Sequence, residues 1–441
     1  MVRRGDGEGV LGVMLDAFNA MIERSSAFFA NERYQGIAGG ISARRPIFKV
    51  LFPIVRWASR SRLGNLVLLV IALLLYRAIR VPSGEALFQI GLSQNNERAF
   101  RRINEASARQ QWSASINGSP VQLSTRLRSL LHLSLLWRLA GKLQQREGNG
   151  PFAHVQLVLT LTAWTIFRTS DFRGVQCVCI ASDHSPAAFA LVSIAQDRGL
   201  KTCYVQHAPV ADYFPPLIYD LSILFDRASR AKYEASAANH RTTNKGRVII
   251  LPPFDEEASL PDLPHRPAYR IGLCLSYLWD TAGVGKLVLE LLDHPSVESI
   301  RLRRHPRCKA SLATLLRDKR VTESRSTRLA EFAQECDIAL VPNSGVAIEL
   351  LHLGRPVMYT PGTDFIANDY YGFVREGIIP LFRGEWLTAP KQLRRFFGDE
   401  WKERYAAFDE TIAEPLEVSR TRAGKAFRDL VETPRPGFAR G

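Results

Sequence analysis

The stretch from Arg301 to Gly362 constrains the fold most, because strand-like and helical patterns alternate along it. A short strand-like run ends at His305-Pro306, and a polar helical segment follows. The apolar strand Asp337–Val341 then leads to Asn343-Ser344-Gly345, and the helix Val346–Leu353 leads into a further strand. Such alternation is typical of a parallel sheet with crossover helices. This part of the chain therefore predicts an α/β domain.

Polar residues follow two of these predicted strands, at the edge where parallel sheets bind ligands. Asn343 or Ser344 can cap the following helix, whose free N–H groups and dipole form an anion site. Gly345 lets a phosphate approach the backbone closely. His305 can donate a hydrogen bond to that phosphate or a proton to a leaving group. Each residue also has a purely structural interpretation, as a helix cap or a solvated loop histidine, but together they favour a nucleotide-phosphate site.

A second α/β unit lies upstream. The strand Val175–Ala181, the helix Ala187–Arg198 and the strand Lys201–Gln206 follow one another closely. Their polar exit loops fall on one edge of the predicted sheet. Proline-rich segments between residues 252 and 267 separate this unit from the later one. The sequence thus predicts two Rossmann-like domains.

Three residues in these exit loops are candidates for catalysis. Asp183 is deprotonated at pH 7 without any shift of its pKa, so it is the preferred general base. His184 or His207 would orient Asp183 or replace it. The alternatives are that Asp183 only caps the helix after Pro186 and that His207 is an ordinary loop histidine.

The composition limits the partners. The 441-residue chain has a net charge of +15, which favours an anionic partner. No zinc-finger spacing and no aromatic-basic RNA motif is present, so we expect no nucleic acid. Arginines bracket apolar stretches in the first eighty residues and favour an anionic membrane surface instead. The six cysteines include no CxxC pair and are expected to be buried free thiols in a reducing compartment. We expect no metal and no cofactor.

The N-terminal region carries the membrane signal. Apolar residues between Val10 and Ile22 recur at helical spacing, and Leu63–Tyr76 carries no charge but is flanked by arginines. That uncharged run is shorter than the roughly 20 residues of a spanning helix. It could be an interfacial or re-entrant anchor, a true span or a buried helix. A further leucine-rich stretch, Leu127–Leu143, is predicted to be a buried helix.

The region from about Gln176 to Pro380 resembles the GT-B glycosyltransferases of bacterial surface-polysaccharide assembly that carry a His-Pro motif. These are the polysialyltransferases, the capsule Kdo transferases and the CDP-glycerol glycerophosphotransferases. The resemblance implies that His305 contacts the phosphate of a cytidine-nucleotide donor and that Asn343-Ser344-Gly345 holds the same phosphate. Pro306 and Glu349 are further candidates for this nucleotide site. His207 resembles the histidine of a His-Gly element in the glycerophosphotransferases, although Ala208 replaces the glycine here.

These observations predict four regions: a membrane-associating region at residues 1–82, an acceptor domain at 83–260, a donor domain at 261–390 and a helical tail at 391–441. The expected activity is metal-independent transfer from a nucleotide sugar, with a CMP-sugar favoured, to a lipid-linked or glycan acceptor. The expected location is the cytoplasmic face of the inner membrane. The alternatives are a glycerophosphotransferase, a UDP-sugar transferase, a sugar-nucleotide epimerase and a non-catalytic, membrane-tethered assembly protein on the same scaffold.

Overall fold

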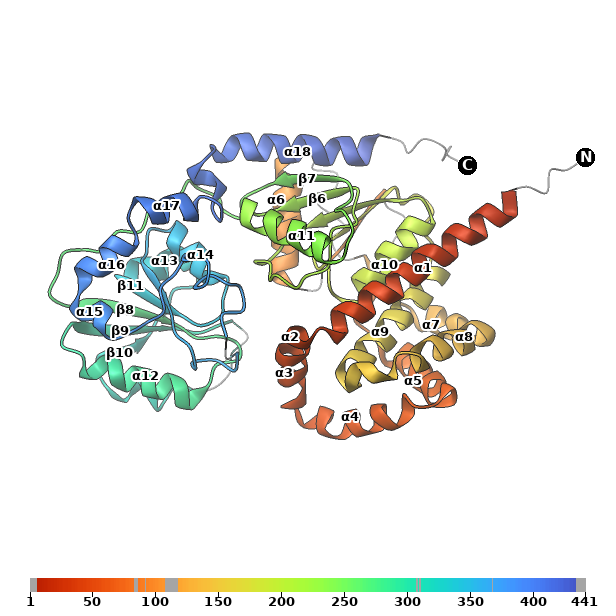
Figure 1. Cartoon of the computed structure of the whole chain (residues 1–441), viewed down its shortest axis with the longest axis horizontal. Coiled ribbons are helices and arrows are strands. Elements are labelled where there is room, and N and C mark those ends of the chain that lie inside the picture. The colour runs from red at the N-terminus through yellow and green to blue at the C-terminus, as the bar shows by residue number, and fades with distance from the viewer. Residues whose placement is uncertain are drawn as a thin grey trace, which may run out of the picture.

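The computed structural model describes residues 6–82, 86–91, 93–107, 118–306, 308, 311–366 and 368–433. Two five-stranded sheets form the centres of two domains, and helices cover both faces of each sheet (Figure 1). Every neighbouring pair of strands in both sheets is parallel. The predicted α/β fold with two Rossmann-like domains is therefore confirmed.

The second sheet has the strand order β10-β9-β8-β11-β12. Its strands are β8 (Tyr269–Cys274), β9 (Val297–Arg303), β10 (Val321–Glu323), β11 (Ile338–Val341) and β12 (Val357–Tyr359). The chain reverses its direction across the sheet between β8 and β11, the point at which doubly wound sheets bind ligands. One face is covered by α12 (Thr281–Asp293), and the other by α13 (Leu329–Glu335) and α14 (Val346–His352).

The first sheet runs in chain order, β2-β4-β5-β6-β7. Its strands are β2 (Leu87–Ile90), β4 (Cys177–Ile180), β5 (Lys201–Val205), β6 (Leu221–Leu224) and β7 (Arg247–Ile250). The helices α9 (Gly150–Thr169), α10 (Pro186–Asp197) and α11 (Arg227–Asn239) share a core with one face, and α6 (Gln94–Ala106) packs on the other. All six cysteines are buried free thiols, three of them in this sheet, as predicted.

The N-terminal helices pack against the first domain. They are α1 (Asp6–Ala30), α2 (Glu32–Tyr34), a π-helical turn (Gln35–Gly39), α3 (Gly40–Ala43), α4 (Pro46–Ala58) and α5 (Arg62–Leu75). Buried side chains of α1 and α5, including Phe29 and Leu73, belong to the same core as Val178 of β4. Residues 80–81 (β1) and 119–120 (β3) form a separate antiparallel pair.

The stretch Leu127–Leu143 is not one buried helix, which corrects the prediction. It forms the end of α7 (Leu123–Leu130) and most of α8 (Leu133–Gln144), and Leu131 between them is 80% exposed. Only one side of α8 is buried, because α5 and α9 cover that side alone. Within the described residues, α9 is the one helix long and apolar enough to cross a membrane, and 72% of its most apolar window is buried inside the protein.

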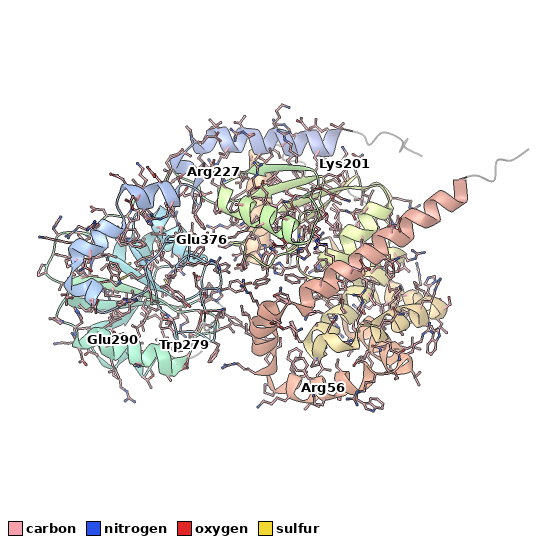
Figure 2. The ribbon with its side chains drawn as sticks, in the orientation of Figure 1. Arg56, Lys201, Arg227, Trp279, Glu290 and Glu376 are labelled. Atoms are coloured by element: carbon pink, nitrogen blue, oxygen red, sulfur yellow. The ribbon has the colours of Figure 1, made fainter. Side chains whose placement is uncertain are left out.

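Of the C-terminal helices, the first three pack on the second domain and the last one returns to the first domain. They are α15 (Glu385–Thr388), α16 (Pro390–Phe396), α17 (Asp399–Tyr405) and α18 (Leu416–Glu432). Short 3₁₀ turns lie elsewhere in the chain at Glu147–Asn149 and Leu315–Arg317, and before α18 at Glu410–Ile412. α18 packs on α6, β6 and β7 (Figure 1). In the same view with side chains, Arg56 marks the lower edge of the N-terminal helices and Glu290 the outer side of the second domain (Figure 2).

Candidate functional site

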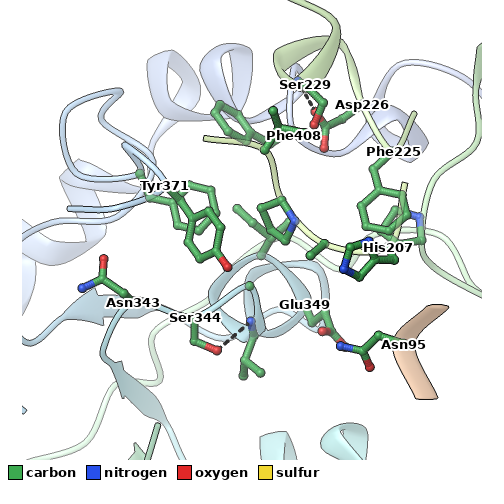
Figure 3. Close-up of a pocket in the computed structure, with 18 of the residues that line it drawn as sticks. Asn95, His207, Phe225, Asp226, Ser229, Asn343, Ser344, Glu349, Tyr371 and Phe408 are labelled. Atoms are coloured by element: carbon green, nitrogen blue, oxygen red, sulfur yellow. Dashed lines mark hydrogen bonds between the residues drawn. The ribbon is translucent and has the colours of Figure 1, made fainter. Parts of the chain in front are cut away.

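A cavity of about 330 Å³ lies between the carboxyl edges of the two sheets (Figure 3). His207 and Phe225 reach it from the first domain, and His305 and Ser344 reach it from the second. The loop after β8, at the reversal point of the second sheet, also lines it through Ser276 and Tyr277. The predicted polar loops after β5, β9 and β11 therefore meet in one common space.

His305 lies two residues beyond β9, and its ring centroid is 5.9 Å from that of Tyr277. Both residues line the cavity. The backbone carbonyl of His305 accepts a hydrogen bond from the N–H of Cys308 at 2.8 Å, which fixes the turn. Pro306 is exposed and is not part of the cavity wall. Of the His-Pro pair, the histidine is thus the residue placed to meet a ligand.

The side chain of Asn343 is occupied within the protein. Its Nδ2 donates to the Tyr359 hydroxyl at 2.9 Å and to the carbonyl of Ile366 at 3.2 Å, and its Oδ1 accepts from the N–H of Tyr370 at 2.8 Å. The bonds to Ile366 and Tyr370 hold the loop after β12 against the cavity, and the bond to Tyr359 connects Asn343 to the end of β12. Asn343 lines the cavity, but its amide shapes the wall rather than offering a free hydrogen-bonding group.

Ser344 and Gly345 stand at the start of α14. The Ser344 hydroxyl oxygen accepts a hydrogen bond from the N–H of Val346 at 3.3 Å, so its own O–H can point into the cavity (Figure 3). A Cβ on Gly345 would lie 2.9 Å from the ring Cδ of Pro209, which belongs to the exit loop of β5. Gly345 is therefore needed for close contact between the two domains. The hypothesis that this glycine lets a phosphate approach the backbone stays a prediction.

His207 is the catalytic candidate that lines the cavity. Burial lowers the pKa of His207 to about 4, so the imidazole is neutral at pH 7. Its Nδ1 is buried and has no hydrogen-bond partner among the described residues. The neighbouring Gln206 fixes the loop, because its amide donates to the carbonyl of Ala208 and to the Ser229 hydroxyl, each at 2.9 Å.

Asp183 and His184 lie outside the cavity wall. The carboxylate of Asp183 is 1% exposed, accepts a hydrogen bond from the Tyr233 hydroxyl at 2.6 Å and lies 2.7 Å from Nδ1 of His184. Burial acts to raise the pKa of Asp183, but these hydrogen bonds and the His184 charge outweigh it and lower the pKa. The ring of His184 packs against Phe214, with centroids 4.6 Å apart. This geometry gives Asp183 an internal position with no direct access to a substrate in the cavity.

The cap of α10 is Ser185, whose hydroxyl oxygen accepts from the N–H of Ala188 at 3.2 Å. The alternative interpretation of Asp183 as that cap is therefore wrong. Asp183 instead connects the loop before α10 to α11 through Tyr233, whose hydroxyl oxygen also lies 3.0 Å from the Tyr204 hydroxyl.

Sequence reasoning missed several charged residues of the cavity wall. Arg98 and Arg102 reach it from α6, and Oε2 of Glu349 lies 4.0 Å from Nη1 of Arg98. Burial and then the Arg98 charge lower the pKa of Arg102 to about 10. No hydrogen bond or ion pair joins Arg102 to another described residue. The cavity thus holds a partly desolvated cation that an anionic ligand would satisfy.

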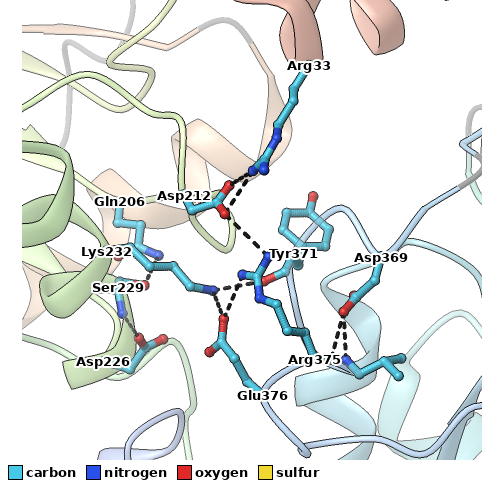
Figure 4. Close-up of polar contacts among 11 residues, drawn as sticks. Arg33, Gln206, Asp212, Asp226, Ser229, Lys232, Asp369, Tyr371, Arg375 and Glu376 are labelled. Atoms are coloured by element: carbon cyan, nitrogen blue, oxygen red, sulfur yellow. Dashed lines mark hydrogen bonds and ion pairs between the residues drawn. The ribbon is translucent and has the colours of Figure 1, made fainter. Parts of the chain in front are cut away.

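Asp226, the residue before α11, and Lys232, on α11, complete the charged part of the wall. Asp226 caps α11 through a 2.6 Å hydrogen bond from the N–H of Ser229, and burial raises the pKa of Asp226 to about 7. Nζ of Lys232 donates to the carbonyl of Tyr371 at 2.8 Å and lies 3.1 Å from Oε1 of Glu376. Lys232 therefore bridges the first domain to the second (Figure 4).

A second bridge runs through Asp212, which accepts from Arg33 at 2.9 Å and from Arg375 at 3.3 Å (Figure 4). Arg33 belongs to α2, Asp212 to the first domain and Arg375 to the second. Each exposed pair contributes little by itself. Together they connect the N-terminal helices to both walls of the cavity.

Comparison with known proteins gives distant likenesses. No protein-family model matches the chain, and no curated protein does. Among solved structures, the GtfA/B complex aligns at 11% identity and a TM-score of 0.35, covering 58% of this chain and 57% of that one. CalG4, the calicheamicin glycosyltransferase, aligns at 11% identity and a TM-score of 0.43, covering 64% of this chain and 81% of its own. The glycosyltransferase of kitacinnamycin aligns at 12% identity and a TM-score of 0.40, covering 79% of this chain and 99% of that one. The chain thus spans little more than half of the first of these structures.

Proposed function

We propose that this chain is a metal-independent glycosyltransferase that binds a nucleotide-activated sugar between its two domains. The supporting observation is the cavity itself, in which His207 of one α/β domain faces the His305 and Ser344 side of the other. Such a cavity, at the carboxyl ends of two parallel sheets, suits a substrate that must be held from both sides.

A cytidine monophosphate sugar is the favoured donor. The cavity of about 330 Å³ lies within the range of ligand pockets. The preference for cytidine rests on the resemblance of the His305-Pro306 and Asn343-Ser344-Gly345 motifs to those of the cytidine-nucleotide enzymes. The hydroxyl of Ser344 and the ring of His305 would hold its phosphate from the second domain. Arg102 would compensate the charge from α6 and gain the anionic partner that it lacks. The UDP-sugar and glycerophosphate alternatives would use the same groups.

In the proposed transfer, the acceptor hydroxyl loses its proton to the neutral imidazole of His207. The acceptor oxygen forms a bond to the anomeric carbon of the sugar, and the bond from that carbon to the phosphate oxygen breaks. The leaving phosphate keeps the electron pair, and the groups around His305 and Arg102 stabilise its charge. His207 is preferred to Asp183 as the base because it lines the cavity, whereas Asp183 does not.

The proposed biological role is assembly of a bacterial surface polysaccharide or glycolipid, with a lipid-linked or growing glycan as acceptor. The proposed location is the cytoplasmic face of the inner membrane. The net charge of +15 and the arginines around the N-terminal apolar helices support an anionic membrane partner.

A ligand-stabilisation screen tests the donor. We expect CMP to raise the melting temperature of the full chain more than CDP or UDP does. His305→Ala should weaken CMP binding at least tenfold by calorimetry, whereas Pro306→Ala, outside the wall, should bind as the natural chain does. Unchanged CMP binding in His305→Ala would refute the proposed phosphate site.

Turnover separates the alternatives. We expect transfer to a glycan acceptor to continue in EDTA, and a magnesium-reversible loss would contradict the metal-independent mechanism. Stabilisation by a nucleotide without any transfer would favour the non-catalytic assembly protein. Product formation without an acceptor would favour the epimerase.

A further inference from the structure

The helices α4, α5, α7 and α8 expose an unusual number of large apolar side chains. Of the nineteen large hydrophobic side chains that are exposed in the described residues, fourteen lie between residues 47 and 137. We call them the apolar face: Ile47, Val50, Ile54, Trp57, Leu63, Val67, Ile71, Leu74, Leu75, Leu123, Leu127, Leu131, Leu133 and Trp137. Single exposed apolar residues are ordinary on soluble proteins, but a continuous group of this kind marks an interaction surface.

The spacing shows that the exposed side of each helix is apolar. On α4, positions 47, 50, 54 and 57 recur every three or four residues, and on α5 positions 63, 67, 71 and 74 do the same. The opposite side of α5 is buried, with Leu69 and Leu73 fully enclosed in the core. These helices are thus apolar on two sides: the side that packs against the core and the opposite side, which no described residue covers.

Contacts between the helices join their stripes into one surface. The Arg62 guanidinium lies 4.4 Å from the centre of the Trp137 ring, at one end of α5. At the other end, Nη1 of Arg126 on α7 donates to the carbonyl of Leu74 at 3.1 Å. α5 therefore lies between α4 on one side and α7 and α8 on the other, as in Figure 1.

The charge of this surface identifies its partner. The four helices carry seven basic residues and no acidic one: Lys49, Arg56, Arg62, Arg126, Arg128, Arg138 and Lys142. Apolar side chains with a basic rim fit the interface of an anionic bilayer, where arginines meet the lipid phosphates. A second copy of this chain would bring the same cations against them without any carboxylate, so a twofold contact through this face would be repulsive.

The orientation in the membrane follows from the packing of α5. Its 14 residues span about 21 Å at about 1.5 Å per residue, which is less than the roughly 30 Å of a bilayer core. Asn65 on its inner side is buried and lies 2.7 Å from His154 of α9. A helix that is fixed to the core along one side cannot be surrounded by lipid.

We propose that α4, α5, α7 and α8 form a monotopic membrane-binding face that lies in the plane of an anionic bilayer without crossing it. The apolar side chains enter the level of the headgroups and the upper acyl chains, and the basic residues contact the lipid phosphates. This inference deepens the proposed membrane location. It includes α7 and α8, which the sequence placed in the protein interior.

Vesicle flotation with the full chain tests the face without any substrate, so its outcome is separate from that of the nucleotide screen. We expect at least tenfold tighter binding to phosphatidylcholine vesicles with about 30% phosphatidylglycerol than to phosphatidylcholine alone. Trp57→Glu on α4 and Leu131→Glu between α7 and α8 should each weaken binding at least tenfold. Leu289→Glu is the matched control, because this residue of α12 is 66% exposed but lies in the second domain.

The charge contribution is tested with Arg128→Gln and Arg138→Gln, both at exposed positions. Each should weaken binding to the anionic vesicles about fivefold, and the difference should disappear at high salt. All these variants should keep the melting temperature of the natural chain, because the replaced side chains are exposed. Such unchanged melting temperatures would show that the variants fold.

Three outcomes would overturn the inference. Binding that does not depend on phosphatidylglycerol would refute the anionic partner. Loss with Trp57→Glu but not with Leu131→Glu would confine the contact to α4 and α5. Concentration-dependent dimers that Trp57→Glu dissociates, with no vesicle binding, would show that a second copy occupies the face.

Discussion

Replacing His207 and Asp183 separately distinguishes the two candidates for the general base. His207→Asn should lower kcat by about 10² to 10⁴ at pH 7, because the neutral imidazole in the cavity would no longer accept the acceptor proton. CMP binding should remain within about threefold, since the proposed phosphate contacts come from the second domain and from α6. Asp183→Asn should leave kcat within a few-fold, because its carboxylate does not line the cavity.

The expected effect of Asp183→Asn is on stability. Its carboxylate has two short partners, the Tyr233 hydroxyl at 2.6 Å and Nδ1 of His184 at 2.7 Å. Hydrogen bonds to a charged group contribute about 1.5–3 kcal/mol each, and neutral ones about 1 kcal/mol. Because asparagine retains only the neutral bonds, the substitution should cost about 1–4 kcal/mol. A domain of this size loses about 2–4 °C in melting temperature for each kcal/mol.

Melting curves and steady-state kinetics on the same preparations measure both effects. His184→Asn is the control for an indirect effect, because His184 contacts Asp183 but lies outside the cavity wall. Asp183 would be the base if Asp183→Asn abolishes turnover at an unchanged melting temperature while His207→Asn remains active. In that case the closed arrangement around Asp183 would have to open during the reaction.

Three further substitutions test the cavity wall. Arg102→Met should weaken CMP binding about tenfold without lowering the melting temperature of the free protein. The reason is that the substitution removes a desolvated cation that has no partner among the described residues. A lower melting temperature with normal CMP binding would contradict this prediction. Gly345→Ala should cost about 1–3 kcal/mol through its clash with Pro209, and Pro209→Ala should relieve that cost in the double variant; additive losses would refute the contact. The raised pKa of about 7 at Asp226 adds stability that is fully present below about pH 4 and is lost as the pH rises through 7. The melting temperature of Asp226→Asn relative to the natural chain should therefore rise between pH 4 and 7, and a flat difference would show that the carboxyl titrates normally.

The sequence predicted the polar loops of the cavity because each follows a strand with a clear pattern. Ile338–Val341 is a short, fully buried apolar run, and Lys201–Val205 is buried at four of its five positions. The exit loops of both strands contain proline. What no pattern could give was the direction of each side chain. Asp183 and His184 follow β4 as predicted, but Tyr233 and Phe214, far along the chain, hold them in the interior.

The arginines of α6 were missed because β2, the strand before it, has no recognisable pattern. Its four residues include Gln89, which is buried and hydrogen-bonded to Asn104 at 3.2 Å. Strands are recognised in a sequence by a continuous apolar run or by alternation of apolar and polar residues. A buried amide in a strand of four residues interrupts the apolar run and leaves too few positions to show alternation. Without β2, nothing indicated that Arg98 and Arg102 begin a crossover helix at the edge of the sheet. Their role can be inferred only from the assembled cavity.

The proposed membrane face and the proposed active site meet at the start of α4. Nη2 of Arg45, the residue before α4, donates to the Tyr277 hydroxyl at 3.1 Å, and Tyr277 lines the cavity. The Arg44 guanidinium lies 3.7 Å from the centre of the Phe365 ring in the second domain. The exposed stripe of α4 begins at Ile47, two residues after Arg45. A bilayer against this stripe would therefore lie beside the cavity. This position favours a lipid-linked acceptor over a soluble glycan, because the lipid could stay in the membrane while its polar end reaches His207.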